Sequence, residues 1–145
     1  MDRLSSEPGT SPDLIKLLSG ILASSHRFAH AVMALEAGLS STQTVPARPG
    51  FRRFADGVDF TLYYLAAAFR GSPLTHEHLP DLREDYRALI HSGESSAERY
   101  LLVNVEMDRI TNSLNTLAEQ VLQWAGGPIR GSELATASSS VSGSR

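Results

Sequence analysis

Cysteine is absent from all 145 residues, and this absence removes several kinds of chemistry at once. Without thiols the chain can form no disulfide, no thiolate metal site and no cysteine nucleophile, while the redox compartment stays open. Lysine is nearly absent as well, because Lys16 is the one lysine beside twelve arginines. The formal net charge of -3 is small, so the whole chain shows no electrostatic preference for nucleic acid.

Long apolar runs are also missing from the sequence. The longest mostly apolar run, residues 60–69, is about half as long as a membrane span and contains Thr61. Residues 1–10 are polar and lack the apolar segment of a signal peptide. We therefore expect a chain that does not cross a bilayer.

Length and composition predict a single domain with polar ends. The chain is 41% apolar, which is enough for one core, and it is too short for two ordinary domains. The expected organisation is a flexible leader at 1–10, a helical bundle at 11–127 and a disordered, serine-rich tail at 128–145.

The first helix is expected to begin at Ser11, followed by Pro12 and Asp13. This order supplies a hydroxyl cap, a proline in the first turn and an acid at the positive end of the helix dipole. Apolar or small residues then recur at alternating steps of four and three, at Leu14, Leu18, Ile21, Ser25, Phe28, Val32, Leu35 and Leu39. The spacing predicts one buried stripe along about seven turns.

Three further helices are predicted, separated by Pro, Gly and Ser clusters. The second carries its buried side at Phe51, Phe54, Val58, Leu62, Leu65 and Phe69. The third begins near Asp81 and carries Leu82, Tyr86, Leu89 and Ile90. The fourth begins after Ser95 or Ser96, with Glu98 placed for a capping box to Ser95. Its stripe keeps one 3-4 rhythm over Tyr100, Val103, Met107, Ile110, Leu114, Leu117, Val121 and Trp124.

The expected fold class is therefore all-α, an up-down-up-down four-helix bundle. The regular 3-4 rhythm is typical of left-handed, nearly antiparallel helix packing. Since the third helix is shorter than the others, we expect one side of the bundle to be partly open.

His26 and His30 lie one turn apart on the first helix, a spacing that can offer two imidazoles to one metal ion. No third ligand is identifiable from the sequence, and a phosphoacceptor histidine would lack a marked motif. The structural interpretation, a pair flanking the Phe28 stripe and bonded to neighbouring carboxylates or carbonyls, is favoured. No cofactor is therefore predicted.

Arg48, Arg52 and Arg53 form a predicted basic patch at the start of the second helix. Such a patch can contact phospholipid headgroups or an acidic partner. The alternative is a solvated helix end balanced by Asp56 and Asp59, and the residue pattern favours it.

The middle of the fourth helix is unusually polar beside its apolar stripe. Glu106 and Arg109 can pair at i, i+3, while Asn112 and Asn115 are poor helix formers within one turn of each other. Together these four residues indicate either a polar network that sets the bundle register or a ligand or oligomer contact. The register interpretation is favoured.

Catalysis finds little support, so the chain is not expected to be an enzyme. The inward Glu-x-x-His repeat of a di-iron bundle is absent, as are phosphate loops and nucleophile elbows. His76, Glu77 and His78 lack the spacing of the zinc-protease motif, and a solvated loop is expected there.

Residues 24–37 read Ser-Ser-His-Arg-Phe-Ala-His-Ala-Val-Met-Ala-Leu-Glu-Ala. This stretch resembles the R-x-A-H-A-x-x-A-L-x-A helix in the soluble parts of the FUSC family, fusaric-acid-resistance-like and aromatic-acid-exporter-like proteins of the bacterial inner membrane. The fourth helix and its serine-rich tail are similar to the ends of such chains, so the likeness spans about 11–125. The family's transport is attributed to membrane helices that this sequence lacks, which is the main departure from the family.

The resemblance implies a cytoplasmic accessory domain of a FUSC-like efflux protein, at the inner face of the membrane, with a membrane-embedded transporter portion as its partner. An interaction or regulatory bundle that acts alone, dimeric through the open side next to the third helix, is the second hypothesis. A bundle that binds a divalent ion through His26 and His30 is the third.

Overall fold

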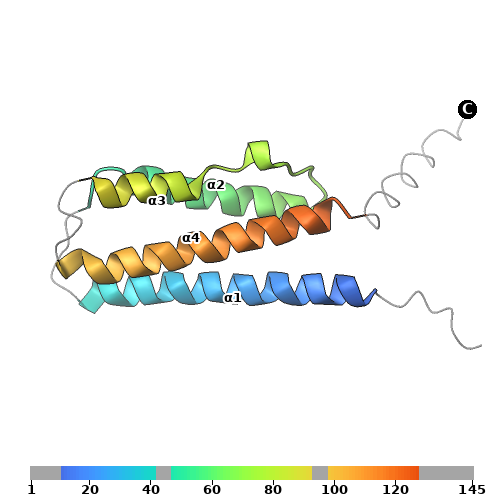
Figure 1. Cartoon of the computed structure of the whole chain (residues 1–145), viewed down its shortest axis with the longest axis horizontal. Helices are drawn as coiled ribbons and strands as arrows, with labels where there is room; N and C mark the ends of the chain where they lie inside the picture. The colour runs from blue at the N-terminus through green and yellow to red at the C-terminus, as the bar shows by residue number, and fades with distance from the viewer. Residues whose placement is uncertain (1–10, 42–46, 93–97, 128–145) are drawn as a thin grey trace, which may run out of the picture.

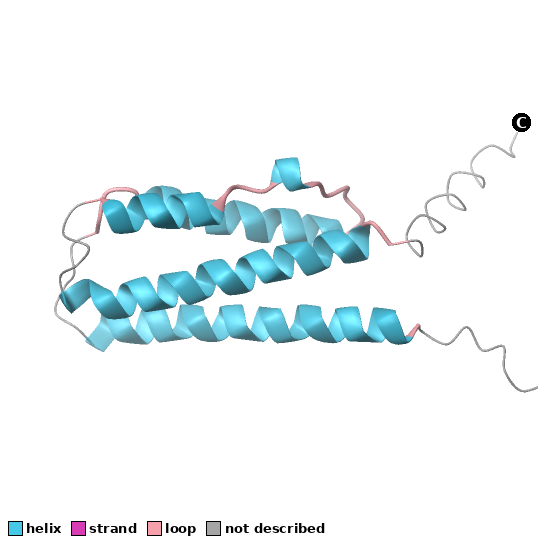
Figure 2. Cartoon of the chain, viewed as in Figure 1, coloured by secondary structure: helices cyan, strands magenta, loops and turns pink. Residues whose placement is uncertain are grey.

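The computed structural model describes residues 11–41, 47–92 and 98–127. In these segments the chain forms α1 (Pro12–Ser41), α2 (Phe51–Phe69), a short 3-10 turn η1 (His76–His78), α3 (Leu82–His91) and α4 (Glu98–Ala125). Successive helices run in opposite directions (Figure 1), and no strand occurs in the described segments (Figure 2). The predicted all-α, up-down-up-down bundle is therefore confirmed. The predicted leader, the serine-rich tail and Ser95 of the capping box lie outside the described residues.

α4 is the central helix of the bundle, because it packs against α1, α2 and α3. Its predicted stripe is confirmed: Tyr100, Met107, Ile110, Leu114, Leu117 and Val121 are buried, and Val103 and Trp124 are half-buried. A 3-4 rhythm keeps these side chains on one face of a helix of 28 residues. That face builds two joined cores, one around Leu114 and Val121 and the other around Met107 and Ile110.

α1 packs mainly on α4, and its predicted stripe is confirmed in part, because Ile21 is buried and Phe28 and Leu35 pack against the core. Ile21, Ser24 and Ala31 are its buried residues, whereas the predicted core positions Leu18, Val32 and Leu39 are 42%, 39% and 43% exposed. Small side chains let the two helix axes approach each other. At Gly20 an added Cβ would lie 2.7 Å from Gln120 Nε2, and at Gly38 it would lie 2.7 Å from Leu102 Cδ2.

α2 and α3 cover the side of α4 that α1 leaves free. α2 buries Phe54 and Leu65 as predicted, while the predicted core residue Phe69 is 47% exposed at the last turn. Gly50, in the left-handed region with φ 85°, precedes α2. α3 begins after Asp81, whose side chain accepts a hydrogen bond from the Glu84 backbone N at 2.9 Å.

None of the helices in the described segments is long and apolar enough to span a membrane.

Candidate functional site

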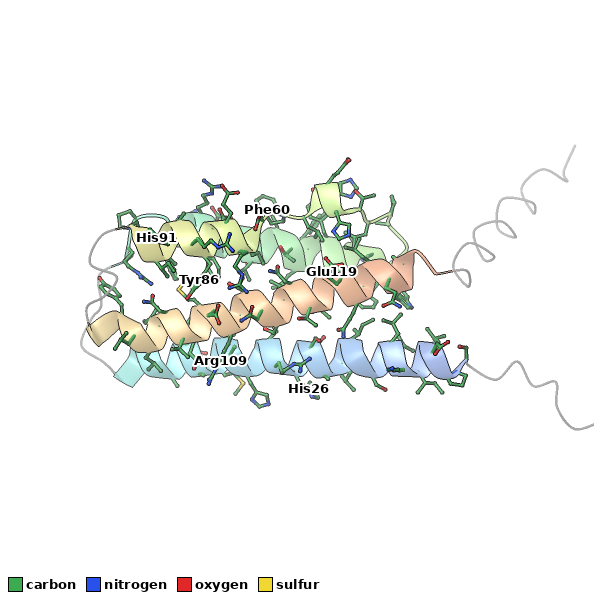
Figure 3. The ribbon with its side chains drawn as sticks, in the orientation of Figure 1. His26, Phe60, Tyr86, His91, Arg109 and Glu119 are labelled. Carbon is green, nitrogen blue, oxygen red and sulfur yellow. The ribbon has the colours of Figure 1, made fainter. Side chains whose placement is uncertain are left out.

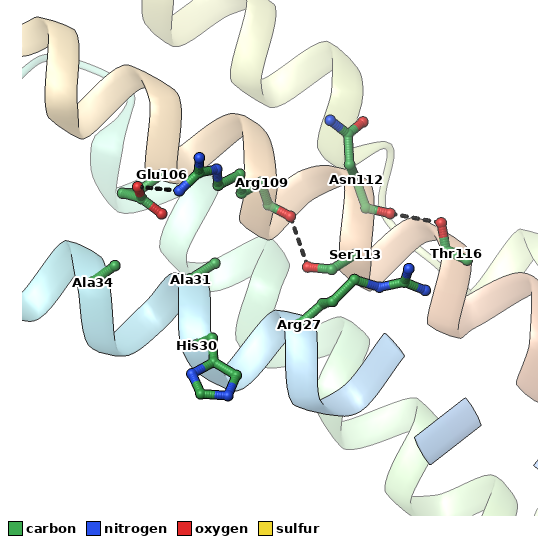
Figure 4. A pocket seen from close by; sticks show the side chains of 9 residues that line it. All are labelled: Arg27, His30, Ala31, Ala34, Glu106, Arg109, Asn112, Ser113 and Thr116. Atoms are coloured by element: carbon green, nitrogen blue, oxygen red, sulfur yellow. Dashed lines mark hydrogen bonds and ion pairs between the residues drawn. The ribbon is translucent and has the colours of Figure 1, made fainter. Parts of the chain in front are cut away.

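A groove of about 790 Å³ lies between α1 and α4 (Figure 4). Its lining comes from both helices: Arg27, His30, Ala31, Ala34, Glu106, Arg109, Asn112, Ser113 and Thr116. Three of the four residues predicted as an interaction cluster on the fourth helix are therefore brought together here. Arg27, Ser113 and Thr116 were not predicted, because no charge or spacing pattern separates them from ordinary helix residues.

Glu106 is a nearly buried carboxylate at the wall of this groove, 3% exposed. Its Oε1 accepts a hydrogen bond from Arg109 Nη1 at 2.8 Å, so the pair predicted at i, i+3 is confirmed. Glu106 Oε2 is buried and has no hydrogen-bond partner in the described part of the chain. The groove thus combines a half-satisfied carboxylate with the exposed guanidinium groups of Arg27 and Arg109.

A second polar contact joins α1 and α4 beside the groove. Ser24, fully buried, donates from Oγ to Gln120 Oε1 at 2.8 Å, and Arg27 Nη2 donates to the same Ser24 Oγ at 3.2 Å. Sequence reasoning missed this contact, because it took the neighbouring Ser25 as the inward residue. The spacing of Gly20, Ser24 and Ala31 is the signal in the sequence that could have indicated this contact, because it places three small residues on one side of the helix.

Asn112 belongs to a network between α3 and α4. Arg83 Nη1 donates to Asp108 Oδ1 at 2.8 Å, and Arg83 Nη2 donates to Asn112 Oδ1. Asn112 Nδ2 in turn donates to Asp108 Oδ2 at 2.9 Å. Asn115, half-buried on α4, lies outside this network. The contacts of Asn112 agree with the predicted polar network that sets the bundle register, because they fix the position of α3 along α4.

Arg48, predicted on a basic surface patch, is instead buried at 8% exposure, so that prediction is wrong for this residue. Its Nη2 donates to Asn104 Oδ1 at 2.7 Å, and its guanidinium carbon lies 4.7 Å from the centre of the Tyr100 ring. Nη1 is buried with no hydrogen-bond partner among the described residues. Burial lowers the pKa of Arg48, against the smaller opposing effects of Tyr100 and Tyr86.

Arg52 and Arg53 remain at the surface but point to different partners. Arg52 Nε lies 3.7 Å from Asp56 Oδ1, and both side chains are mostly exposed. Arg53 Nε lies 2.6 Å from Oδ1 of Asp85, a buried residue of α3. The ion pair of Arg52 with Asp56 agrees with the favoured prediction of a solvated helix end balanced by acids. The ion pair of Arg53 with Asp85 links α2 to α3.

His26 and His30 are both exposed on α1, where His26 lies at the edge of the molecule (Figure 3). His30 borders the groove, and neither imidazole forms an ion pair with a carboxylate of the residues that the structure describes. Among the described residues no group of three or more His, Cys, Asp or Glu side chains could hold a metal ion. The divalent-ion hypothesis therefore gains no third ligand.

The loop predicted around residues 76–78 is a 3-10 turn, exposed as expected. His78 stacks on the ring of Tyr64 with a centroid separation of 5.5 Å, and His76 Nδ1 lies 3.7 Å from Glu119 Oε1. The two histidines thus contact different helices, α2 and α4, and share no ligand.

α1 also carries a row of exposed apolar residues on the side that α4 does not cover. We call this row the outer seam and define it by positions spaced three and four apart: Ile15, Leu18, Leu22, Ser25, Ala29, Val32, Glu36 and Leu39. Its five large apolar side chains are between 39% and 58% exposed, and Met33 beside it is 62% exposed. The polar groove and the outer seam therefore give α1 two different unburied sides.

No family model, curated protein or solved structure matches this chain. The resemblance to the FUSC family, and the transporter role that it implies, therefore stay predictions carried by residues 24–37 and the helix pattern alone.

Proposed function

We propose that this chain is a non-enzymatic helical bundle that binds a protein partner through the outer seam of α1. The observation that carries the proposal is the row of large apolar side chains left exposed along nearly the whole of α1. Single exposed apolar residues are ordinary on a protein surface, but a continuous row marks a surface that another chain covers.

The energetics favour a covered seam. Each square ångström of apolar surface removed from water contributes roughly 25 cal/mol, so a seam of five large side chains offers several kcal/mol to a partner. Helical partners fit such a surface best, because side chains spaced three and four apart interlock with the same spacing on a second helix. Catalysis has no part in this proposal.

An extract of the source cells provides the test, with the chain carrying an affinity tag at one end. The unchanged chain should elute in a complex larger than its monomer, while the double variant Leu22→Glu, Met33→Glu should elute as a monomer. Both replaced side chains are mostly exposed, so the fold should survive, which circular dichroism checks. Elution of the unchanged chain as a monomer from an extract that holds it at about 100 µM contradicts the proposal.

The resemblance offers one identity for the partner, the membrane-embedded portion of a FUSC-like efflux protein at the cytoplasmic face of the inner membrane. Arg52 and Arg53 at the surface would then lie where anionic headgroups are available. This version predicts membrane-spanning segments encoded immediately upstream in the source DNA. Their absence from that DNA would remove this version and leave the interaction role unchanged.

A further inference from the structure

The outer seam has the period of a two-stranded coiled coil. Its eight positions are spaced alternately three and four residues apart, and six of the eight carry apolar residues. The neighbouring inner positions Ile21, Ser24 and Ala31 are buried inside the bundle, so the seam is a second and separate stripe on the same helix. A helix with two stripes of this kind can pack on two helices at once.

We propose that the seam pairs with the seam of a second copy of this chain, antiparallel, so that α1 lies against α1 of the partner copy. This inference rests on the proposed function and names its partner. It would make α1 the shared middle of a dimer, with each copy's α4 on the outer side of its own α1.

The order of side chains along the seam favours an identical partner. In an antiparallel pair centred near residue 27, Ile15 meets Leu39, Leu22 meets Val32, and Ser25 meets Ala29, each twice by symmetry. Large side chains thus pack on large ones towards both ends, and small ones meet at the centre. Leu18 is the exception among the apolar residues, because it lies opposite Glu36 in this register.

The charge in the seam favours the antiparallel direction. Glu36 is its one charged residue. In a parallel pair Glu36 would face Glu36 of the other copy, and like charges held together are destabilising. The antiparallel pair places Glu36 opposite Leu18 near the rim, about one and a half turns from the end of α1, where the carboxylate can reach water.

The size of the seam predicts a weak dimer. From Ile15 to Leu39 the seam is about 36 Å long, at a rise of about 1.5 Å per residue, on a helix about 10 Å wide. Two such strips bury on the order of 1,000 Å² in total, near the lower limit of specific interfaces. We therefore expect a dissociation constant in the micromolar range and a mass that rises with concentration.

Light scattering of the purified chain from about 5 to about 500 µM, a range that brackets micromolar affinity, tests the dimer. The mass should rise from one to two chains, and Leu22→Glu should keep it at one chain throughout. Leu101→Glu is the matched control, because Leu101 on α4 is 54% exposed against 58% for Leu22. A constant monomer, or equal dissociation by both variants, overturns the inference.

The natural absence of cysteine makes the direction of pairing measurable. The variants Ser25→Cys and Ala29→Cys, one of them carrying a tag that changes its mass, are oxidised separately and as a mixture. In an antiparallel pair the mixture should form a disulfide-linked dimer of one Ser25→Cys chain and one Ala29→Cys chain. The yield of this mixed dimer should be at least tenfold higher than the yield of cross-linked dimer from either variant alone. Stronger cross-linking within each separate variant indicates a parallel pair and overturns the antiparallel proposal.

The outcomes separate this inference from the proposed function. A complex in extracts that Leu22→Glu, Met33→Glu abolishes, together with a purified monomer at every concentration, overturns the second copy and keeps the interaction role. A monomer in both experiments overturns both.

Discussion

At the scale of single residues, Arg48 is a buried charge whose hydrogen-bonding partner is neutral. A guanidinium always holds its charge near neutral pH, and here it is buried with Asn104 Oδ1 as a neutral acceptor and the Tyr100 ring at its face. Nη1 has no acceptor in the described part of the chain. The neutral Asn104 oxygen offsets less of the desolvation cost of the Arg48 guanidinium than a carboxylate would. The positive charge of Arg48 therefore adds little to the stability of the fold.

Removing this charge while keeping the bulk of the side chain should therefore be tolerated. We expect Arg48→Met to change the free energy of unfolding by less than about 1.5 kcal/mol, in either direction. Asn104→Ala removes the oxygen acceptor of the buried charge, leaves the weaker Met107 Sδ, and should cost about 1–3 kcal/mol. Urea unfolding of both variants beside the unchanged chain measures the difference. A loss of more than 3 kcal/mol in Arg48→Met would show that the charge is needed.

Tyr86 predicts a pH dependence at alkaline pH. Burial, and next to it the charge of Asp108, raises the pKa of Tyr86 above its ordinary value of 10.0, against smaller opposing effects of Arg83 and Arg48. The pKa of Tyr86 is higher in the folded than in the unfolded chain, so its protonated form contributes to folding stability. This contribution is complete below pH 10 and is lost as the pH rises through the folded pKa. Unfolding by urea between about pH 9 and about pH 11 should therefore show falling stability.

The variant Tyr86→Phe isolates this effect, since every other titrating group is the same in both proteins. Its stability should fall less steeply over that pH range than the stability of the unchanged chain. Parallel curves for the two proteins would mean that ionisation of Tyr86 is not linked to folding.

At the scale of elements, α4 and α1 show why one helix was predicted fully and the other in part. α4 contacts helices on both sides of one apolar face, so its stripe and its buried face coincide. α1 carries apolar residues around more than half of its circumference, and no periodicity distinguishes an inward face from an outward one. Close approach decided the orientation, and it depends on Gly20, Ser24 and Ala31, which a search for large apolar residues passes over.

The two glycines on this face should respond differently to a methyl group. Alanine gains roughly 1 kcal/mol of helix propensity over glycine at either position. At Gly38 the methyl meets the end of Leu102, which is 46% exposed and can move aside, so Gly38→Ala should be neutral or stabilising. At Gly20 the methyl group displaces the Gln120 amide, which accepts a hydrogen bond from Ser24. Losing this hydrogen bond costs about 1–3 kcal/mol and offsets the gain in helix propensity.

Thermal and urea unfolding of the pair measures this contrast. We expect Gly20→Ala to be less stable than Gly38→Ala by about 1–2 kcal/mol. The double variant Gly20→Ala, Ser24→Ala serves as control, because it removes the hydroxyl that needs the Gln120 acceptor and should recover part of the loss. Equal stability of the two single variants would contradict the assigned role of the Ser24 to Gln120 contact.

At the scale of the whole molecule, the bundle is unevenly supported. α4 packs on three helices, α2 and α3 pack on each other and on α4, and α1 depends mainly on α4. The sequence predicted four antiparallel helices, because stripes and breakers are local signals. It could not place Arg48 in the interior or bring Arg27 to the groove opposite Arg109, since those outcomes depend on how helices rotate against one another.

This uneven support predicts where amide hydrogens exchange fastest. A helix held on one face opens at lower cost than a helix held on several, so α1 should exchange faster than the middle of α4 in dilute solution. If α1 pairs with a second copy, raising the concentration adds support to α1 alone. Exchange in α1 should then slow by at least threefold between dilute and concentrated samples, while exchange in α2 and α3 stays constant. Mass spectrometry of peptic peptides resolves the helices, and Leu22→Glu should abolish the concentration effect. Uniform slowing across all four helices would instead indicate non-specific association, because a seam on one helix can protect only the helix that carries it.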